Sequence, residues 1–287
     1  LMGRLIGWAD ERFNTGSVSQ GPPWSMTGRR AKGIALVLVL CAASALLGLA
    51  LSALPFGYFF EVLLASILLA HKSLVQHVAA VADALRLSPG DGRRAVAHIV
   101  GRDTSDMDPA ATARAAIESA AENFSDGVVA PAFWFLIAGL PGILIYKIIN
   151  TADSMIGYKT RRYEEFGWAA ARLDDVLNWL PARITALLII ATSWRTGNWL
   201  SHVWPILQRD ARQHRSPNAG WPEAAMATVL SVALAGPRSY EGALQDFPFV
   251  YPEGRRDIGA GDIDAAVTAL WRCWAALLVI TLIVAIF

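Results

Sequence analysis

Charged residues are scarce in this chain of 287 residues, of which only 17% are Asp, Glu, Lys or Arg while 54% are hydrophobic. A soluble domain usually carries about 25% charged residues. Residues 33–60 contain no ionised side chain at all, and about 20 apolar residues in a helix suffice to cross a bilayer. The composition therefore excludes a disordered chain and predicts a protein embedded in a lipid bilayer.

The chain also lacks the marks of several other protein classes. Its 25 Lys and Arg residues balance 24 Asp and Glu without a basic run, so nucleic acid is not an expected partner. Two cysteines, Cys41 and Cys273, are too few for a disulfide framework or a zinc site. The sequence contains no GxxxxGK[ST] phosphate loop, no GxGxxG after a strand and no GxSxG elbow. Any nucleotide must therefore be bound without a familiar motif.

Prolines and glycines divide the apolar runs into segments of unequal length. We predict a single all-α domain, a polytopic membrane helical bundle with broken or re-entrant helices and polar connecting segments. The predicted divisions are a polar N-terminal segment (1–32), a helical hairpin (33–70), a polar or amphipathic segment with a helix over 71–87 (71–126), membrane-embedded and catalytic segments (127–270) and a C-terminal membrane helix (271–287).

Residues 127–146 are uncharged, but Pro131 and a Gly-Leu-Pro-Gly break at 139–142 interrupt them. Polar segments lie on both sides of this run, and they can form one site only if both face the same aqueous side. We therefore predict a helical hairpin or re-entrant pair here, with Ser105 and Thr160 accessible from the same face of the membrane.

A helix is expected to end near Leu180, because Pro181 follows it. The next apolar run, residues 184–194, is too short to cross a bilayer by itself. It is therefore expected to re-enter the membrane or to pair with the segment after it.

The first of three polar segments places Arg114, Glu118, Glu122 and Asp126 at intervals of four, on one helix face. Like charges at this spacing repel, so the acids must be solvated or neutralised by a cation. One interpretation is a solvated face on which Arg114 pairs with Glu118. The alternative is a magnesium or amine site, which Asn123 beside the acids favours.

The second polar segment, residues 150–178, combines acids and amides with several cations, as a site for magnesium and phosphate would. A charged loop beside the membrane with internal salt bridges is the alternative. The third segment, residues 210–222, precedes an alanine-rich helix, and its Ser216, Asn218 and backbone amides are candidates to bind an anion.

Five stretches resemble one known family in their order and spacing. They are GRDT at 101–104, ESAAENFSDGVVAP at 118–131, NTADSMIGY at 150–158, FGWAAARLDDVLNWLPAR at 166–183 and SPNAGWPEAAMA at 216–227. They are similar to motifs of the adenosylcobinamide-phosphate synthases of cobalamin biosynthesis, and the likeness covers about residues 1–270. Relatives usually have another hydrophobic segment upstream, so a further segment is expected before Leu1.

The resemblance implies a multi-pass amide ligase of the bacterial inner membrane, with its active site facing the cytoplasm. Such an enzyme joins aminopropanol or its phosphate to the free carboxylate of adenosylcobyric acid, a corrinoid, and uses ATP and Mg²⁺. Together with residue chemistry it suggests catalytic Glu118, Glu122, Asp126 and Asp153; substrate- or phosphate-binding Arg102, Asn123, Lys159, Arg172, Arg183, Ser216 and Asn218; and metal ligands Asp174, Asp175 and Glu122. A homo-oligomer is a further expectation.

Two other functions compete with the ligase. A UbiA-like prenyltransferase is also a membrane helical bundle with magnesium-diphosphate acids, but it needs two Asp-rich motifs, which Asp153 and the Asp174–Asp175 pair imitate poorly. A transporter would place charges inside its spans, whereas here the charges gather in connecting segments.

Overall fold

The computed structural model describes residues 2–15, 23–193, 199–240 and 243–286. Within these ranges helices dominate, and the strands are two or three residues long. Five of the described helical stretches are long and apolar enough to cross a membrane. They are Thr27–Ser52, Gly57–Leu87, Pro109–Ile156, Trp168–Thr192 and Ala260–Val284. The predicted fold class, an all-α polytopic bundle, is confirmed.

Contacts divide the chain into two compact units, each assembled from segments far apart in sequence. Unit 1 contains Leu1–Leu69 and Ala130–Asn178, and unit 2 contains Ala70–Val129 and Trp179–Phe287. Helix α8 (Trp168–Thr192) contributes its first part to unit 1 and the remainder to unit 2.

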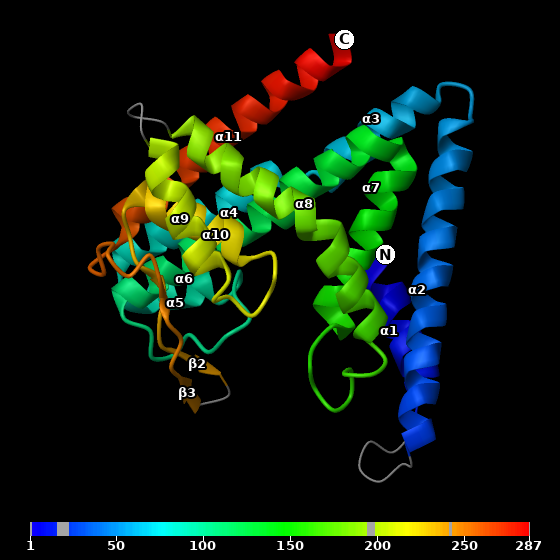
Figure 1. Cartoon of the computed structure of the whole chain (residues 1–287), viewed down its shortest axis with the longest axis horizontal. Helices are drawn as coiled ribbons and strands as arrows, with labels where there is room; N and C mark the ends of the chain where they lie inside the picture. The colour runs from blue at the N-terminus through cyan, green and yellow to red at the C-terminus, as the bar shows by residue number, and fades with distance from the viewer. Residues whose placement is uncertain (1, 16–22, 194–198, 241–242, 287) are drawn as a thin grey trace. The chain divides into compact units, whose positions relative to one another are not determined.

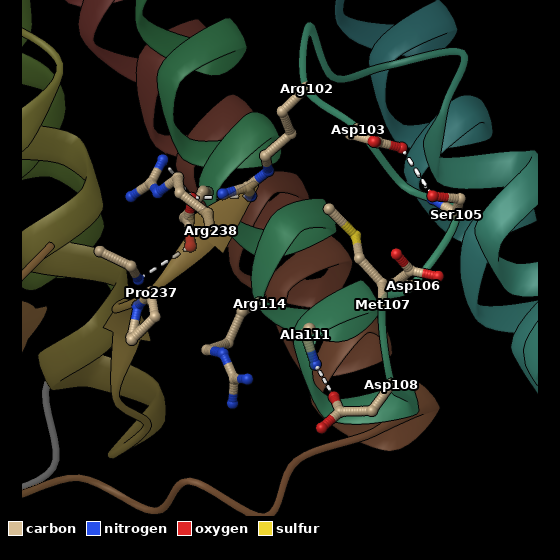
Figure 2. Close-up of a pocket in the computed structure, with 12 residues that line it drawn as sticks. Arg102, Asp103, Ser105, Asp106, Met107, Asp108, Ala111, Arg114, Pro237 and Arg238 are labelled. Carbon is tan, nitrogen blue, oxygen red and sulfur yellow. Dashed lines mark hydrogen bonds and ion pairs between the residues drawn. The ribbon is translucent and has the colours of Figure 1, made fainter. Parts of the chain in front are cut away.

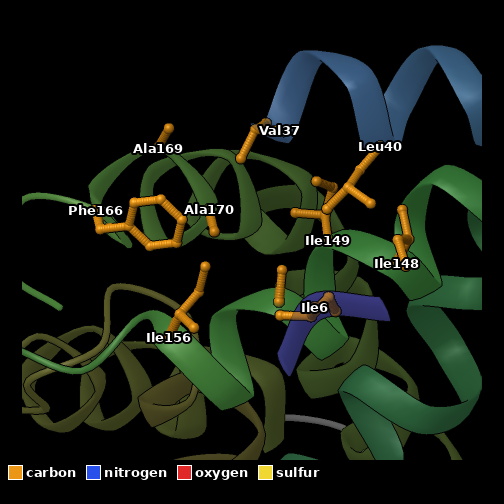
Figure 3. Packing of buried hydrophobic residues seen from close by; sticks show 10 residues of the cluster. Ile6, Val37, Leu40, Ile148, Ile149, Ile156, Phe166, Ala169 and Ala170 are labelled. Atoms are coloured by element: carbon orange, nitrogen blue, oxygen red, sulfur yellow. The ribbon is translucent and has the colours of Figure 1, made fainter. Parts of the chain in front are cut away.

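In unit 1, helices α1, α2 and α3 pack against α7 (Figure 1). Buried apolar side chains of α1, α2, α7 and the beginning of α8 form the core shown in Figure 3. Gly33 of α2 lies so close to Phe166 that an added Cβ would come within 2.0 Å of the Phe166 carbonyl oxygen. The bounds are α1 Met2–Phe13, α2 Pro23–Ser52, α3 Gly57–Leu68 and α7 Ala130–Ile156.

Two of these helices refine the predicted hairpin at 33–70. The chain breaks between α2 and α3, around Pro55. However, α2 begins at Pro23 rather than Gly33, and α1 occupies part of the segment 1–32.

Helix α7 bends sharply at its predicted break. Ala138 and Gly139 have non-helical backbone angles, with φ of −134° and +58°. A Cβ on Gly142 would come within 2.2 Å of the Trp134 carbonyl oxygen, although these residues would lie about 12 Å apart along a straight helix. The two halves of α7 therefore turn back on each other, and the predicted broken helix is confirmed.

The predicted end of a helix just before Pro181 is wrong. Helix α8 continues through Pro181 to Thr192, so most of the run 184–194 is the last part of the same helix. Proline has no N–H, which deprives the Leu177 carbonyl of its helical partner. The indole Nε1 of Trp134 donates to that carbonyl instead, at 3.0 Å, and this tertiary bond lets α8 pass the proline.

We expect Trp134→Phe to destabilise the protein by about 1–3 kcal/mol, because it leaves the Leu177 carbonyl without a partner. In a Pro181→Ala background the restored N–H can bond this carbonyl, so the same substitution should cost much less. Thermal unfolding of the four proteins in detergent measures the difference. An equal cost in both backgrounds would show that the indole bond does not compensate for the proline.

In unit 2, α4 packs against α5, α6 and α11, and α10 packs against α6 and α9 (Figure 1). The predicted amphipathic helix over 71–87 is confirmed residue for residue. The bounds are α4 His71–Leu87, α5 Pro89–Val96, α6 Pro109–Phe124, α9 Trp199–Ala211, α10 Gly220–Leu230 and α11 Ala260–Ile286.

Helix α6 carries the first polar segment and begins with a capping residue followed by proline. The Asp108 side chain caps it by accepting a bond from the Ala111 N–H at 2.6 Å, and Pro109 occupies the first turn. After Phe124 the chain forms a π-helical turn, η1 (Ser125–Val129). Such turns are frequent at functional sites.

Short antiparallel strand pairs bring a distant part of the chain to α6. Strand β1 (Leu234–Ala235) pairs with β4 (Phe249–Val250), and β1 contacts α6. Strand β2 (Arg238–Tyr240) pairs with β3 (Ala243–Gln245). The pairing places Ala235 and Arg238 beside the acids of α6.

Candidate active site

A buried carboxylate, Glu118, forms the centre of the candidate site in unit 2. It is 4% exposed, and its Oε2 accepts a bond from Arg102 Nη2 at 2.9 Å. Arg238 Nη1 lies 3.4 Å from the same oxygen, while the Ala235 N–H donates to Oε1 at 2.8 Å. Both carboxylate oxygens are therefore engaged, and two guanidinium groups are held side by side.

A cavity of about 350 Å³ opens beside this cluster. Its lining comes from the loop before α6, from α6 itself and from the chain around β1 and β2 (Figure 2). The charged residues in the lining are Arg102, Asp103, Asp106, Asp108, Arg114, Glu118 and Arg238. The loop, the helix and the strands thus contribute to one charged pocket.

A smaller cavity of about 140 Å³ shares Ala235 and Arg238 with the larger one. His214 also lines it, and the Phe247 ring there has guanidinium carbons of Arg215 at 4.4 Å and Arg238 at 5.0 Å from its centroid. The Phe247 ring thus gives Arg238 a second contact besides Glu118.

Behind the smaller cavity, Glu223 of α10 forms a buried pair with His214. Its Oε1 lies 3.6 Å from His214 Nε2, and its buried Oε2 has no hydrogen-bond partner among the described residues. The Ser216 N–H donates to His214 Nδ1 at 3.0 Å, so neutral His214 carries its proton on Nε2, toward Glu223.

Burial shifts both groups of this pair toward their neutral forms. It raises the pKa of Glu223 well above the usual range, and the nearby Glu118 and Glu122 raise it further. Burial also lowers the pKa of His214 from its usual value. The pair therefore adds little charge to the interior while keeping a titratable proton next to the site.

The raised pKa of Glu223 predicts a pH-dependent effect of Glu223→Gln. The neutral acid stabilises the fold fully below the unfolded pKa of about 4.3, and this stability is lost as pH rises through the folded pKa. Glutamine stays neutral, so the melting temperature of the Glu223→Gln variant, relative to that of the natural protein, should rise between pH 5 and pH 8. The control is Glu11→Gln, at an exposed position of α1. The same pH dependence of the melting-temperature difference in both variants would contradict the prediction.

The structure changes the interpretation of the first polar segment. Glu118 pairs with Arg102 and Arg238, while Arg114 donates to the Arg256 carbonyl at 3.1 Å, so the interpretation in which Arg114 pairs with Glu118 is not what the helix uses. Glu122 is exposed one turn further on. Asn123 donates to Ser119 of its own helix, and Asp126 lies half-buried in η1.

The third polar segment lies in the same unit. Arg183 Nη1 donates to Asn218 Oδ1 at 3.2 Å, and its guanidinium carbon lies 4.8 Å from the Trp221 ring centroid. Ser216 Oγ accepts bonds from the N–H groups of Asn218 and Ala219, both at 3.2 Å. The amides proposed for an anion are thus used to begin α10, and anion binding there stays a prediction.

The second polar segment up to Asn178 belongs to unit 1. Asp174, 8% exposed, accepts bonds from Asn150 Nδ2 at 3.2 Å and Asn178 Nδ2 at 2.9 Å. Asp153 and Asp175 belong to the same unit, and the joint role of the three aspartates stays a prediction.

The cations of this segment lie at the protein surface. Arg172 is exposed and reaches Asp175 at 3.5 Å, and Lys159 is exposed. The participation of all three polar segments in one site stays a prediction.

Within the described residues, no three His, Cys, Asp or Glu side chains are grouped so that they could hold a metal ion by themselves. Magnesium in phosphate-binding enzymes often takes only one or two carboxylates together with substrate phosphates. The acids present are sufficient for a magnesium ion that is held mainly by substrate phosphates. The ligand roles of Glu122, Asp174 and Asp175 stay predictions.

Several residues of the site could not be identified from the sequence alone. Glu223 lies inside the stretch 216–227 that carries the family resemblance, but its isolated position in an alanine-rich helix gives no charge pattern. Arg238 of β2 contacts Glu118 although the two residues are far apart in the sequence. Asp106 is one of several loop acids, and only the cavity singles it out.

Long apolar helices and a buried acid–arginine cluster define a multi-pass membrane protein with a polar site. A family profile described as CobD/Cbib protein matches residues 1–270. The chain is 49% identical over 279 residues to the cobalamin biosynthesis protein CobD of Brucella anthropi, covering 94% of this chain and 84% of the relative. The protein of the same name from Sinorhizobium fredii is 47% identical over 285 residues (96% and 85%), and that of Rhodobacter capsulatus 49% over 235 (79% and 73%).

No solved structure matches the chain. The profile match and these relatives show that the chain belongs to the CobD/Cbib family of cobalamin biosynthesis proteins. The resemblance found in the five sequence stretches is thereby confirmed.

Proposed function

We propose that this protein is an ATP-dependent amide ligase that attaches (R)-1-amino-2-propanol, or its phosphate, to the free carboxylate of adenosylcobyric acid. The product is adenosylcobinamide or its phosphate. The structural observation that carries this proposal is the pair of buried guanidinium groups held by Glu118 at the wall of a 350 Å³ cavity. Membership of a cobalamin biosynthesis family supports it.

Amide formation from a carboxylate needs activation, because the free carboxylate has no adequate leaving group. In the proposed reaction a carboxylate oxygen attacks the terminal phosphorus of ATP, and ADP leaves. The amine nitrogen then attacks the acyl carbon, the carbon–oxygen bond to phosphate breaks, and the nitrogen loses a proton. Both steps develop negative charge on phosphoryl oxygens.

Arg102 and Arg238 are suited to stabilise this phosphoryl charge. Their guanidinium groups are largely withdrawn from solvent, where charge-assisted hydrogen bonds are strong. Glu118 already engages both of its oxygens in positioning them. We therefore assign Glu118 to orient the arginines rather than to bind a metal or act as a base.

The proton of the amine requires another acceptor. Glu122 is exposed one helical turn beyond Glu118, and we assign it to this role. Its charge is one of those that raise the pKa of the buried Glu223. Magnesium, when bound with the nucleotide, supplies neutralisation of phosphate charge. We place the site on the cytoplasmic side of the bacterial inner membrane, where ATP is available.

The test is a reconstituted reaction of the full chain in detergent or nanodiscs with ATP, Mg²⁺, adenosylcobyric acid and aminopropanol or its phosphate. ADP release that depends on both co-substrates, with an amide product detected by mass spectrometry, supports the ligase. Transfer of a prenyl group from a prenyl diphosphate to an aromatic acceptor, without ADP release, would instead favour the prenyltransferase. Same-side labelling of cysteines at positions 105 and 160 tests the topology.

A further inference from the structure

The beginnings of two membrane helices, α2 and α8, lie side by side at one end of unit 1 (Figure 1). The guanidinium carbon of Arg30 in α2 is 3.8 Å from the ring centroid of Trp168, the first residue of α8. Gly33 packs against the Phe166 backbone, and Phe166 belongs to the core that these helices share (Figure 3). The spanning stretches that begin at Thr27 and Trp168 therefore start within about one helical turn of each other.

The length of α2 places this level at a membrane surface. Its charge-free part, residues 33–52, is about 30 Å long as a helix, which matches the thickness of the hydrocarbon core of a bilayer. The exposed Tyr58 follows its far end, as is typical of a membrane–water interface. The cations at its near end are Arg29, Arg30 and Lys32. In a bilayer these three side chains therefore lie at the level of the lipid headgroups.

Hydrogen bonds join these cations to the end of α1 and to the loop between α7 and α8. Lys32 Nζ donates to the Phe13 carbonyl at 3.4 Å. Asn14, the residue after α1, donates to the Arg162 carbonyl at 3.2 Å. Arg162 Nη2 in turn donates to Asp10 Oδ2 at 2.6 Å. The three segments therefore meet at this end of unit 1.

Positive charge exceeds negative charge in these segments, residues 10–14, 27–33 and 157–168. Asp10 is buried and already paired with Arg162. The side chains that remain are six cations and three acids: Arg12, Arg29, Arg30, Lys32, Lys159 and Arg161 against Glu11, Glu164 and Glu165. An anion that reaches this surface is therefore attracted to it.

The contact with Trp168 holds Arg30 without occupying its hydrogen-bond donors. In a cation–π contact the guanidinium group is attracted to the face of the ring and not to an acceptor atom. Arg30 is half-buried and Trp168 is 37% exposed, so a ligand can reach the pair from outside. A planar guanidinium group in this position matches two oxygens of a phosphate group.

Apolar side chains continue the face of α2 that carries Arg30. Ile34 and Leu38 follow it at intervals of four residues, so the three side chains lie on one face. Ile34 is 38% and Leu38 is 64% exposed. A headgroup at Arg30 would thus have apolar protein surface next to it, toward the interior of the bilayer. An acyl chain can pack on this surface, whereas a free phosphate ion cannot use it.

We propose that the beginning of α2 binds an anionic phospholipid. Arg30, held over Trp168, donates to the headgroup phosphate. Arg29 and Lys32 add positive charge beside it, and an acyl chain lies along the apolar face that follows. Basic residues next to a membrane span attract anionic lipids in this way. The site does not depend on the proposed ligase activity, since none of its residues lines the charged cavity of unit 2.

The test measures the Kd of single phospholipids for the full chain, purified in a neutral detergent, by native mass spectrometry. The probes are dioleoyl phosphatidylglycerol, which is anionic, and dioleoyl phosphatidylcholine, which carries no net charge. The natural protein should bind phosphatidylglycerol about 10- to 100-fold more tightly, since each of the three cations contributes about fivefold. Raising the ionic strength from about 0.05 M to about 0.5 M should remove most of this preference.

Two variants test the residues of the site. Arg29→Gln combined with Arg30→Gln should raise the Kd of phosphatidylglycerol about 5- to 25-fold and leave that of phosphatidylcholine unchanged. Trp168→Leu retains every charge but releases Arg30, so it should weaken phosphatidylglycerol about two- to fivefold. Melting temperatures in detergent without anionic lipid establish that each variant is folded.

The matched control removes another adjacent pair of arginines, Arg93→Gln combined with Arg94→Gln. They lie in α5, outside the five spanning stretches, so the affinity for either lipid should stay the same. Equal weakening of phosphatidylglycerol by this control would show attraction by overall charge and would overturn the proposal.

Two further results would also overturn it, and both come from the natural protein, so they do not depend on the folding of a variant. The first is an equal Kd for the two lipids. The second is displacement of phosphatidylglycerol by inorganic phosphate beyond the effect of chloride at the same ionic strength, because the cations would then serve a free phosphate ion.

Discussion

Replacing Glu118 with alanine is expected to destabilise the protein by about 3–5 kcal/mol and to abolish ligation. The substitution leaves Arg102 and Arg238, with side chains 8% and 14% exposed, without the carboxylate that pairs them. Breaking a buried ion pair from one side has this order of cost because an uncompensated charge stays inside. Thermal or denaturant unfolding in detergent measures the stability, and ADP release measures the activity.

Two further variants separate the charge of Glu118 from its shape. Glu118→Gln retains an acceptor for the Ala235 N–H but loses the negative charge, so it should recover part of the stability and little of the activity. Asp83→Asn removes a carboxylate from an exposed pair with Arg86 and should leave stability unchanged. If Glu118→Gln behaved like Asp83→Asn in both assays, the ion-pair cluster would not be the functional centre.

Replacing Gly142 with alanine should have the second largest effect, a loss of about 2–3 kcal/mol through steric overlap. The new Cβ would come within 2.2 Å of the Trp134 carbonyl oxygen and within 2.8 Å of the Ala138 Cβ. The two halves of α7 would have to separate, although alanine favours a helix over glycine by about 1 kcal/mol. The melting temperature of the purified protein reports the loss.

Gly261→Ala is the matched control, because it makes the same change in the first turn of another membrane helix, α11, where an added Cβ meets nothing within 4 Å. It should be neutral or stabilise the protein slightly, as helix propensity alone predicts. Similar melting temperatures for the two glycine variants would contradict the close approach of the α7 halves.

Local patterns in the sequence predicted the helices whose boundaries depend on neighbouring residues. The amphipathic helix over 71–87 is confirmed, since periodicity acts within one or two turns. The break at 139–142 was predictable for the same reason, because glycine and proline act on their own backbone.

Predictions failed where a distant residue changed a local preference. Pro181 should end a helix, but Trp134 bonds the carbonyl that the proline leaves open. One interpretation of the sequence paired Glu118 with Arg114 one turn away, yet Glu118 pairs with Arg102 and Arg238. Neither Trp134 nor Arg238 lies near its partner in sequence, so no window of residues could have indicated the contact.

The sequence by itself determined that this is a helical membrane protein of a cobalamin biosynthesis family, because composition and motifs need no coordinates. Only the tertiary structure decided which charges are paired. Pairing depends on distances between segments that the chain brings together by folding, as Arg238 at Glu118 shows.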